Sequence, residues 1–180
     1  EYGNPVIEVK ADKDKQTLHI IDQGIGMTKE EVEKYINEVA FSGAEEFLEK
    51  YKDSAKDSGI IGHFGLGFYS AFMVANKVEI ITKSYKDEPS AHWICEGTTD
   101  FSLEEADKTE RGTEIILHIN DDEKEFLEDN RISELLTKYN KFMPIPIKFG
   151  TKEKELPKAE DAPEDEEAKK VTVDNIINNP

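Results

Sequence analysis

The chain has 180 residues, enough for one domain of ordinary size, and 40 acidic against 23 basic side chains give it a formal net charge of −17. This excess of acid argues against a nucleic-acid backbone as partner, because duplex binding depends on Lys and Arg neutralising phosphates. It also means that a bound anion would be held by local backbone amides, a helix N-terminus or a metal. The single cysteine, Cys95, excludes an internal disulfide and fits a reducing compartment. No apolar run approaches the roughly 20 residues of a membrane span.

Hydrophobic alternation predicts a hairpin near the start of the chain. Residues 6–10 and 17–21 alternate as two strands, and the second leads into the carboxylate of Asp22. Thr28, followed three residues later by Glu31, forms a capping box, which predicts that a helix begins there.

The same patterns predict the elements that follow. The apolar segment 68–75 predicts a short buried helix, and residues 121–139 predict a longer amphipathic one. Residues 101–111 are acidic and are predicted to be a loop. The segment 144–149 is predicted to be an edge strand, because proline cannot donate to a ladder on both sides. Three more strands are predicted at 78–85, 91–96 and 113–119.

Together these elements predict an α+β fold, a two-layer sandwich with one mostly antiparallel sheet and helices on one face. The domain is expected to span residues 1–150. Residues 151–170 are Lys, Glu, Asp, Ala and Pro with almost nothing to bury, which predicts an acidic, disordered linker. Residues 171–180 are expected to begin the connection to a further domain. Because the chain starts at Glu1 and ends at Pro180, we expect it to be cut from a longer protein.

The stretch Asp22-Gln23-Gly24-Ile25-Gly26 places a carboxylate at the end of a buried strand, where it is costly without a partner. The two glycines let the backbone turn sharply or approach a ligand closely. We hypothesise that Asp22 accepts a hydrogen bond from a ligand and that the glycines give that ligand room. The alternative is a plain strand-to-helix turn. The Rossmann fingerprint lacks its third glycine here, and the GxxxxGK phosphate loop is absent from the chain.

A second glycine stretch, Gly62-His63-Phe64-Gly65-Leu66-Gly67, precedes the helix predicted to start at Phe68. Free amides and the helix dipole would favour an anion there, whereas the alternative is a glycine hinge without a ligand. The two stretches together favour a phosphate-bearing ligand. Thr113 could donate a hydroxyl hydrogen bond beside Asp22 if their strands are neighbours, although a β-branched residue at a strand start explains it equally simply.

The four histidines are not expected to form a metal site. Three lie in separate predicted strands without paired spacing and the fourth lies among glycines, so structural or surface roles are favoured for His19, His63, His92 and His118.

Four stretches in this order carry a resemblance to a known family. They are Ile21-Asp22-Gln23-Gly24-Ile25-Gly26-Met27-Thr28, Ser42-Gly43, Ile61-Gly62-His63-Phe64-Gly65-Leu66-Gly67-Phe68-Tyr69-Ser70 and Gly112-Thr113. They resemble the N-terminal ATP-binding domain of the heat-shock protein 90 chaperones, particularly the bacterial high-temperature protein G branch. The wider superfamily includes gyrase B, sensor histidine kinases and the MutL mismatch-repair ATPases. The resemblance covers the chain to about Phe149.

The resemblance implies a binding site for ATP or ADP with Mg²⁺. Asp22 would accept from the adenine amino group, and Gly24, Gly26, Met27 and Thr113 would line or support the adenine pocket. Ser42 and Gly43 would stand near the ribose and phosphates. A mobile lid would span about residues 35–69, and the residues at its end would turn their amides to the phosphates: Gly62, His63, Phe64, Gly65, Leu66, Gly67 and Phe68. Lid closure would exclude water and strengthen charge interactions inside.

The chain also departs from the family pattern. The family helix that carries the general-base glutamate and the asparagine that holds magnesium is expected before Glu1, so no catalytic or metal-ligating residue is assigned here. Phe41 stands where a lysine is frequent, Tyr35 where an asparagine is frequent, and His63 where glutamine is common. We therefore expect weak or absent ATP binding and no turnover from these 180 residues alone.

For the parent protein the resemblance implies an ATP-driven chaperone in the cytoplasm. It would act on unfolded client proteins and form a homodimer, without a nucleic-acid or membrane partner. Two alternatives stay open: the ATPase domain of a histidine kinase or gyrase B, and a non-catalytic module that uses the sheet and the acidic tail for protein contacts.

Overall fold

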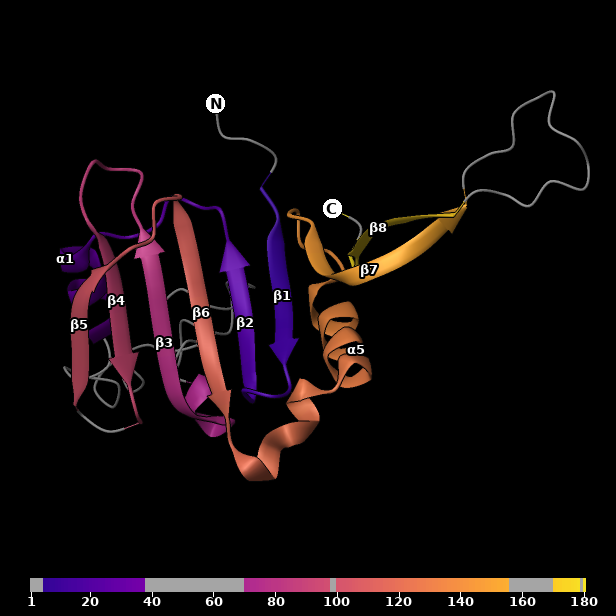
Figure 1. Ribbon diagram of the computed structural model, residues 1–180, viewed down its shortest axis with the longest axis horizontal. Coiled ribbons are helices and arrows are strands. Elements are labelled where there is room, and N and C mark those ends of the chain that lie inside the picture. The colour runs from indigo at the N-terminus through magenta and orange to yellow at the C-terminus, as the bar shows by residue number, and fades with distance from the viewer. Residues whose placement is uncertain (1–4, 38–69, 98–99, 156–169, 179) are drawn as a thin grey trace, which may run out of the picture.

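The computed structural model describes residues 5–37, 70–97, 100–155, 170–178 and 180. Eight strands form one sheet in the order β5-β4-β3-β6-β2-β1-β7-β8, and every neighbouring pair is antiparallel except the parallel pair β1 and β7 (Figure 1). The strands are β1 (Ile7–Asp12), β2 (Thr17–Asp22), β3 (Ala75–Lys83), β4 (Ser90–Cys95), β5 (Phe101–Ala106), β6 (Gly112–Ile119), β7 (Ile147–Glu155) and β8 (Lys170–Ile176).

The helical elements pack on one face of this sheet, as the sequence predicts. They are α1 (Lys29–Val32), the π-helix η1 (Glu33–Asn37), the 3₁₀-helices η2 (Ser70–Met73) and η3 (Asp121–Leu127), and α5 (Asp129–Asn140). Val32 of α1 and Leu127 of η3 join the core cluster that contains Trp93, and Ile132 of α5 joins a second cluster around Val9. The predicted α+β class, with a mostly antiparallel sheet and helices on one face, is confirmed.

The core face of the central strands is ordered in rows, because directly paired residues of neighbouring strands point to the same side. Two of the rows are apolar. One consists of Leu18, Leu117, Val78 and Cys95, and the next consists of Ile20, Ile115, Ile80 and Trp93. Trp93, Ile80 and Val78 are at most 1% exposed, so the core is centred under β3 and β4.

The predicted helix start at Thr28 is confirmed. The Thr28 hydroxyl accepts the amide hydrogen of Glu31 at 3.2 Å, and the Glu31 carboxylate accepts the amide hydrogen of Thr28 at 2.8 Å. Lys86, in the turn after β3, makes an ion pair of 2.7 Å with Glu31. This reciprocal cap fixes how the chain leaves β2 and enters α1.

Several sequence expectations on the helix and strand assignments are wrong. The single helix predicted at 121–139 is divided into η3 and α5 by Glu128, whose backbone is extended. Residues 101–106 are strand β5 and not a loop, because β4 offers its edge and Leu103 packs opposite the buried Trp93, which overrides the acidic composition. The buried helix predicted at 68–75 is only the short η2 within the described residues. Ala75 already opens β3, and Met73 at the end of η2 is 78% exposed.

The C-terminal part of the sheet is longer than the sequence predicts. Residues 151–155, expected in the linker, continue β7, and β8 pairs with it, so β7 is an interior strand rather than an edge. The two prolines of the predicted strand precede Ile147, where they withhold no ladder hydrogen bond. Asn178, 3% exposed, holds the end of the chain by hydrogen bonds to the backbone of Met143, Ile145 and Ile147.

Candidate functional site

At one end of the sheet, the row that follows the apolar row of Ile20, Ile115 and Ile80 is polar across β2, β6 and β3. Asp22 pairs directly with Thr113, and Thr113 pairs with Thr82. We call Asp22, Thr113 and Thr82 the polar row. It lies on the helix-covered face, because each member stands two residues beyond a member of the apolar row that contains Ile80.

The Asp22 carboxylate is half-buried, and the turn that follows uses only one of its oxygens. Its Oδ1 accepts the amide hydrogen of Gly24 at 2.7 Å, whereas Oδ2 has no hydrogen-bond partner among the described residues. The second oxygen is therefore available to accept a hydrogen bond from a donor outside the described residues. That a ligand donates to this oxygen stays a prediction.

Gly26 explains why the turn can lie so close to the sheet. Its φ of +62° is unfavourable for other residues, and a Cβ there would stand 1.9 Å from the carbonyl oxygen of Lys83. The contact continues through the amide of Tyr85, which donates to the carbonyl of Ile25 at 2.8 Å. Glycine at this position therefore brings the turn after β2 against the end of β3.

Thr82 joins the turn to the polar row and was missed from the sequence. It is fully buried, and its Oγ1 accepts the amide hydrogen of Met27 at 2.9 Å. The same Oγ1 lies 3.0 Å from Oγ1 of Thr113. The available signal was the alternation Val78, Ile80, Thr82, which places a polar side chain in the inward series of a strand.

Five of the sequence-predicted site residues are thus brought together: Asp22, Gly24, Gly26, Met27 and Thr113. Ser42, Gly43 and the whole stretch from Gly62 to Phe68 lie outside the described residues, and so does the lid segment from 38 to 69. The binding roles of all these residues remain predictions.

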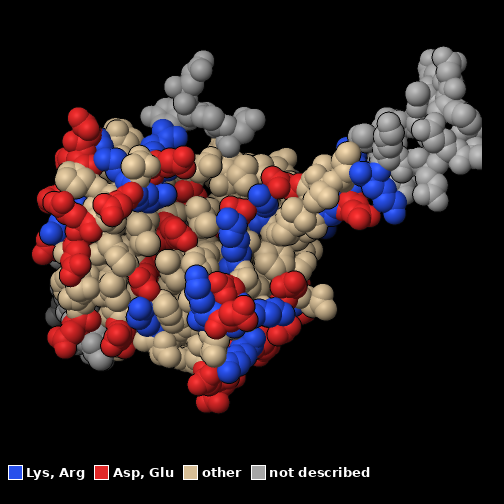
Figure 2. All heavy atoms as spheres, in the orientation of Figure 1, with Lys and Arg blue, Asp and Glu red and all other residues tan. Residues whose placement is uncertain are grey.

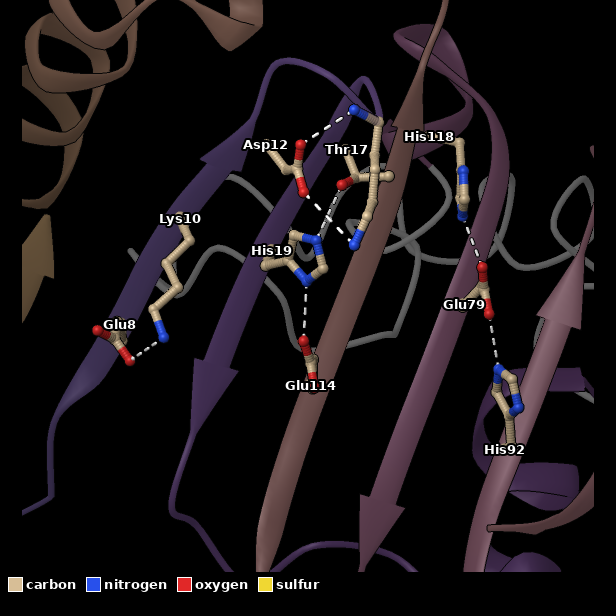
Figure 3. A network of polar contacts seen from close by, with 10 residues as sticks. Glu8, Lys10, Asp12, Thr17, His19, Glu79, His92, Glu114 and His118 are labelled. Carbon is tan, nitrogen blue, oxygen red and sulfur yellow. Dashed lines mark hydrogen bonds and ion pairs between the residues drawn. The ribbon is translucent and has the colours of Figure 1, made fainter. Parts of the chain in front are cut away.

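The opposite, open face of the same strands carries a second group of polar residues (Figure 3). His118 and His92 both direct Nε2 at the Glu79 carboxylate, at 2.6 and 2.7 Å, and Lys77 lies 3.1 Å from it. Burial raises the pKa of Glu79, but hydrogen bonds from His118, Lys77 and His92 outweigh it and lower the pKa to about 2.

A neighbouring pair on the open face follows the same scheme. His19 contacts the Glu114 carboxylate through Nδ1 at 2.8 Å and the Thr17 hydroxyl through Nε2 at 2.9 Å. The three described histidines therefore have structural partners, as favoured from the sequence, and His63 is outside the described part. Among the described residues there is no group of three His, Cys, Asp or Glu suited to a metal ion.

Figure 2 shows that acidic and basic side chains are interspersed over this open face. In the part of the chain that the structure describes, we find no helix with the length and apolar character needed to span a membrane.

Comparison with known proteins gives consistent matches. Residues 4–125 match the family model described as histidine kinase-, DNA gyrase B- and HSP90-like ATPase. The chain is 59% identical over 179 residues to chaperone protein HtpG of Bacteroides thetaiotaomicron, covering 99% of this chain and 24% of that protein. It is 52% identical to HtpG of Porphyromonas gingivalis, covering 85% and 22%, and 45% identical to HtpG of Shewanella amazonensis, covering 89% and 26%.

The chain spans about a quarter of the length of these curated relatives. The family match covers more than half of the chain, and it includes the polar row and the turn between β2 and α1. On these grounds the chain belongs to the histidine kinase-, DNA gyrase B- and HSP90-like ATPase family, in its HSP90 branch of HtpG-type N-terminal ATPase domains.

Proposed function

We propose that the protein containing this chain is an ATP-dependent molecular chaperone, and that the polar row receives the adenine ring of ATP or ADP. The observation that carries the proposal is the unused oxygen of Asp22, at the end of a strand whose next row is fully apolar. The family membership and the HtpG relatives support the nucleotide as the ligand.

The chemistry of the row suits an aminopurine. A carboxylate only accepts hydrogen bonds, so it selects a ring that presents an N–H donor, which the exocyclic amino group of adenine does. Gly24 places no Cβ against the Asp22 carboxylate, where one would stand 2.8 Å from Oδ1. The apolar row below, with Ile20 and Ile115, gives the ring a dry floor that strengthens the polar contact.

The phosphate end of the nucleotide is assigned to residues outside the described part. Ser42 and Gly43 would lie near the ribose and phosphates, and the backbone amides of Gly62 to Phe68 would face the phosphates as the lid closes. Bound ATP would supply the phosphoanhydride bond whose hydrolysis drives the chaperone. No Mg²⁺ ligand and no general base is assigned to the described residues.

The wider assignments belong to the same proposal. The full-length protein would act on unfolded client proteins as a homodimer in the cytoplasm. Residues 1–180 alone would bind nucleotide weakly and release no phosphate, because the resemblance places the general base and the Mg²⁺ ligand outside them. The three HtpG relatives support this reading over a histidine kinase or gyrase.

A calorimetric titration of the full-length protein with ADP tests the proposal. We expect micromolar binding that Asp22→Ala weakens at least about 100-fold, since it removes the charge-assisted acceptor of the adenine amino group. Glu114→Ala is the matched control: it removes a carboxylate one residue beyond Thr113, on the opposite face of β6. Wild-type affinity in Asp22→Ala would refute the adenine site.

The same titration with residues 1–180, together with a phosphate-release assay, tests the assignment of the catalytic groups. Micromolar affinity or measurable turnover from this polypeptide would contradict it.

A further inference from the structure

Thr82 has no solvent access, and so its hydroxyl proton must find a partner inside the protein. Two acceptors lie near its Oγ1: Oγ1 of Thr113 at 3.0 Å and the carbonyl oxygen of Gly112 at 3.4 Å. The longer distance is beyond the usual range for O–H···O hydrogen bonds, which is about 2.5–3.0 Å. The proton of Thr82 is therefore best placed toward Thr113.

The direction of this hydrogen bond decides whether the Thr113 hydroxyl can donate to another group. If Thr113 donated to Thr82, the proton of Thr82 would have only the long contact to Gly112 in a region that water does not reach. Thr113 is 8% exposed and lies beside Asp22, so its own proton has access to a ligand or to water. The arrangement that satisfies the more deeply buried group leaves Thr113 as a donor facing the site.

The hydrogen bonds that run from Met27 through Thr82 to Thr113, which we call the relay, begin with the Met27 amide. It donates to Oγ1 of Thr82 at 2.9 Å, which occupies a lone pair of that oxygen and anchors the turn that carries Gly26. Thr82 thus holds two parts of the site at once, the turn after β2 and the hydroxyl of Thr113.

From this geometry we infer that Thr82 is a positioning residue that sets the site's preference for adenine over 6-oxopurines. The inference rests on the proposed function. Asp22 offers an acceptor, and Thr82 commits Thr113 to donate beside it. Adenine presents the complementary edge, an amino donor next to the ring acceptor N1. Hypoxanthine and guanine present a carbonyl acceptor next to an N–H donor, and both contacts become repulsive.

The test compares ADP with IDP, which differ at this edge, in calorimetric titrations of the full-length protein. We expect the wild type to bind ADP at least about 100-fold more tightly than IDP. Thr82→Val keeps the shape and removes the hydroxyl, so we expect ADP affinity to fall about tenfold and the ADP-to-IDP ratio to fall by a similar factor. Thr82→Ser restores the hydroxyl and should restore both values.

Several outcomes separate this inference from the function on which it rests. If the wild type does not bind ADP, or if Asp22→Ala binds it equally well, the proposed function fails. If those results are as expected and folded Thr82→Val keeps both affinity and ratio within about twofold of wild type, the inference alone is overturned. Failure of Thr82→Ser to restore the ratio also overturns it, because the hydroxyl at this position would then not be what sets the preference.

A double variant and a fallback complete the test. Thr82→Val and Thr113→Val act on one relay, so the double variant should lose no more discrimination than Thr113→Val alone; additive losses contradict the relay. Should Thr82→Val not fold, Thr82→Ala is measured by the same criteria, with circular dichroism to confirm the fold.

Discussion

The two faces of β2, β3 and β6 both carry polar side chains, but the carboxylates on the two faces differ in their hydrogen-bond partners. On the open face the carboxylates of Glu79 and Glu114 are each matched by histidines from neighbouring strands. On the covered face Asp22 shares one oxygen with its own turn and keeps the other without a partner among the described residues. Adjacent residues of one strand, Thr113 and Glu114, thus belong to two different chemical environments.

The difference separates polar groups that stabilise a sheet from polar groups that await a ligand. A carboxylate that hydrogen-bonds side chains of neighbouring strands, as Glu79 does through both oxygens, contributes to stability and selects nothing. A carboxylate left with a free oxygen above an apolar floor, beside a glycine turn, costs stability until a donor arrives. The first group should respond to pH and hardly to nucleotide, whereas the second should respond to nucleotide.

The largest effect on stability is expected from Gly26→Ala, which breaks the covered face. The added Cβ would meet the Lys83 carbonyl oxygen at 1.9 Å, and the backbone φ is positive, so we expect a loss of about 3 kcal/mol or more. Gly150→Ala is the matched control, with φ +68° and open space around its Cβ. It should cost about 1 kcal/mol from backbone strain alone. Urea unfolding followed by the fluorescence of Trp93 measures both, and equal losses would contradict the close approach.

An intermediate effect is expected from Glu79→Gln on the open face. The pKa of Glu79 is lowered from 4.5 to about 2, so its contribution is fully present above pH 4.5 and is lost as the pH falls through 2. At pH 7 the variant should be less stable by about 1.5–3 kcal/mol, the usual worth of hydrogen bonds to a charged group.

Unfolding of Glu79→Gln and wild type at pH 7, 4.5, 3 and 2 follows this contribution. The gap in unfolding free energy should narrow between pH 4.5 and 2. A gap that stays constant down to pH 2 would speak against the hydrogen bonds from His118, Lys77 and His92. ADP affinity at pH 7 should be unchanged, because none of these groups faces the polar row.

The smallest effect is expected at the helix start between the two regions. Thr28→Ala removes the capping hydroxyl and should cost about 1 kcal/mol. Lys86→Ala removes only the partly exposed ion pair with Glu31 and should cost less than the loss of the cap, because exposed ion pairs contribute little. Thermal unfolding of the two variants checks the order, and a larger loss for Lys86→Ala would show that the cap is not what holds α1.

Much of the architecture could be predicted because local sequence patterns determine it. The hairpin β1–β2, the strands β3, β4 and β6, and the cap at Thr28 follow from alternation and from one hydrogen-bonding motif. Strand β5, the extension of β7 to Glu155 and its pairing with β8 could not be predicted, since their acidic and basic residues form strands only when a partner edge is present.

The candidate site was predictable to a similar degree. Asp22 and its glycines stand out because a carboxylate and two glycines interrupt an apolar strand end. Thr82 does not stand out, because its role depends on the register that places it beside Thr113 and under the Met27 amide. A residue 55 positions from Met27 in sequence becomes its hydrogen-bond partner only through the sheet.

The most direct test of the adenine site is a crystal structure of the full-length protein with ADP. The expected result is the amino nitrogen of adenine within hydrogen-bond distance of the free Asp22 oxygen, with the ring over Ile20 and Ile115. A nucleotide bound elsewhere, or an adenine whose amino group faces solvent while Asp22 stays without a partner, would contradict the account.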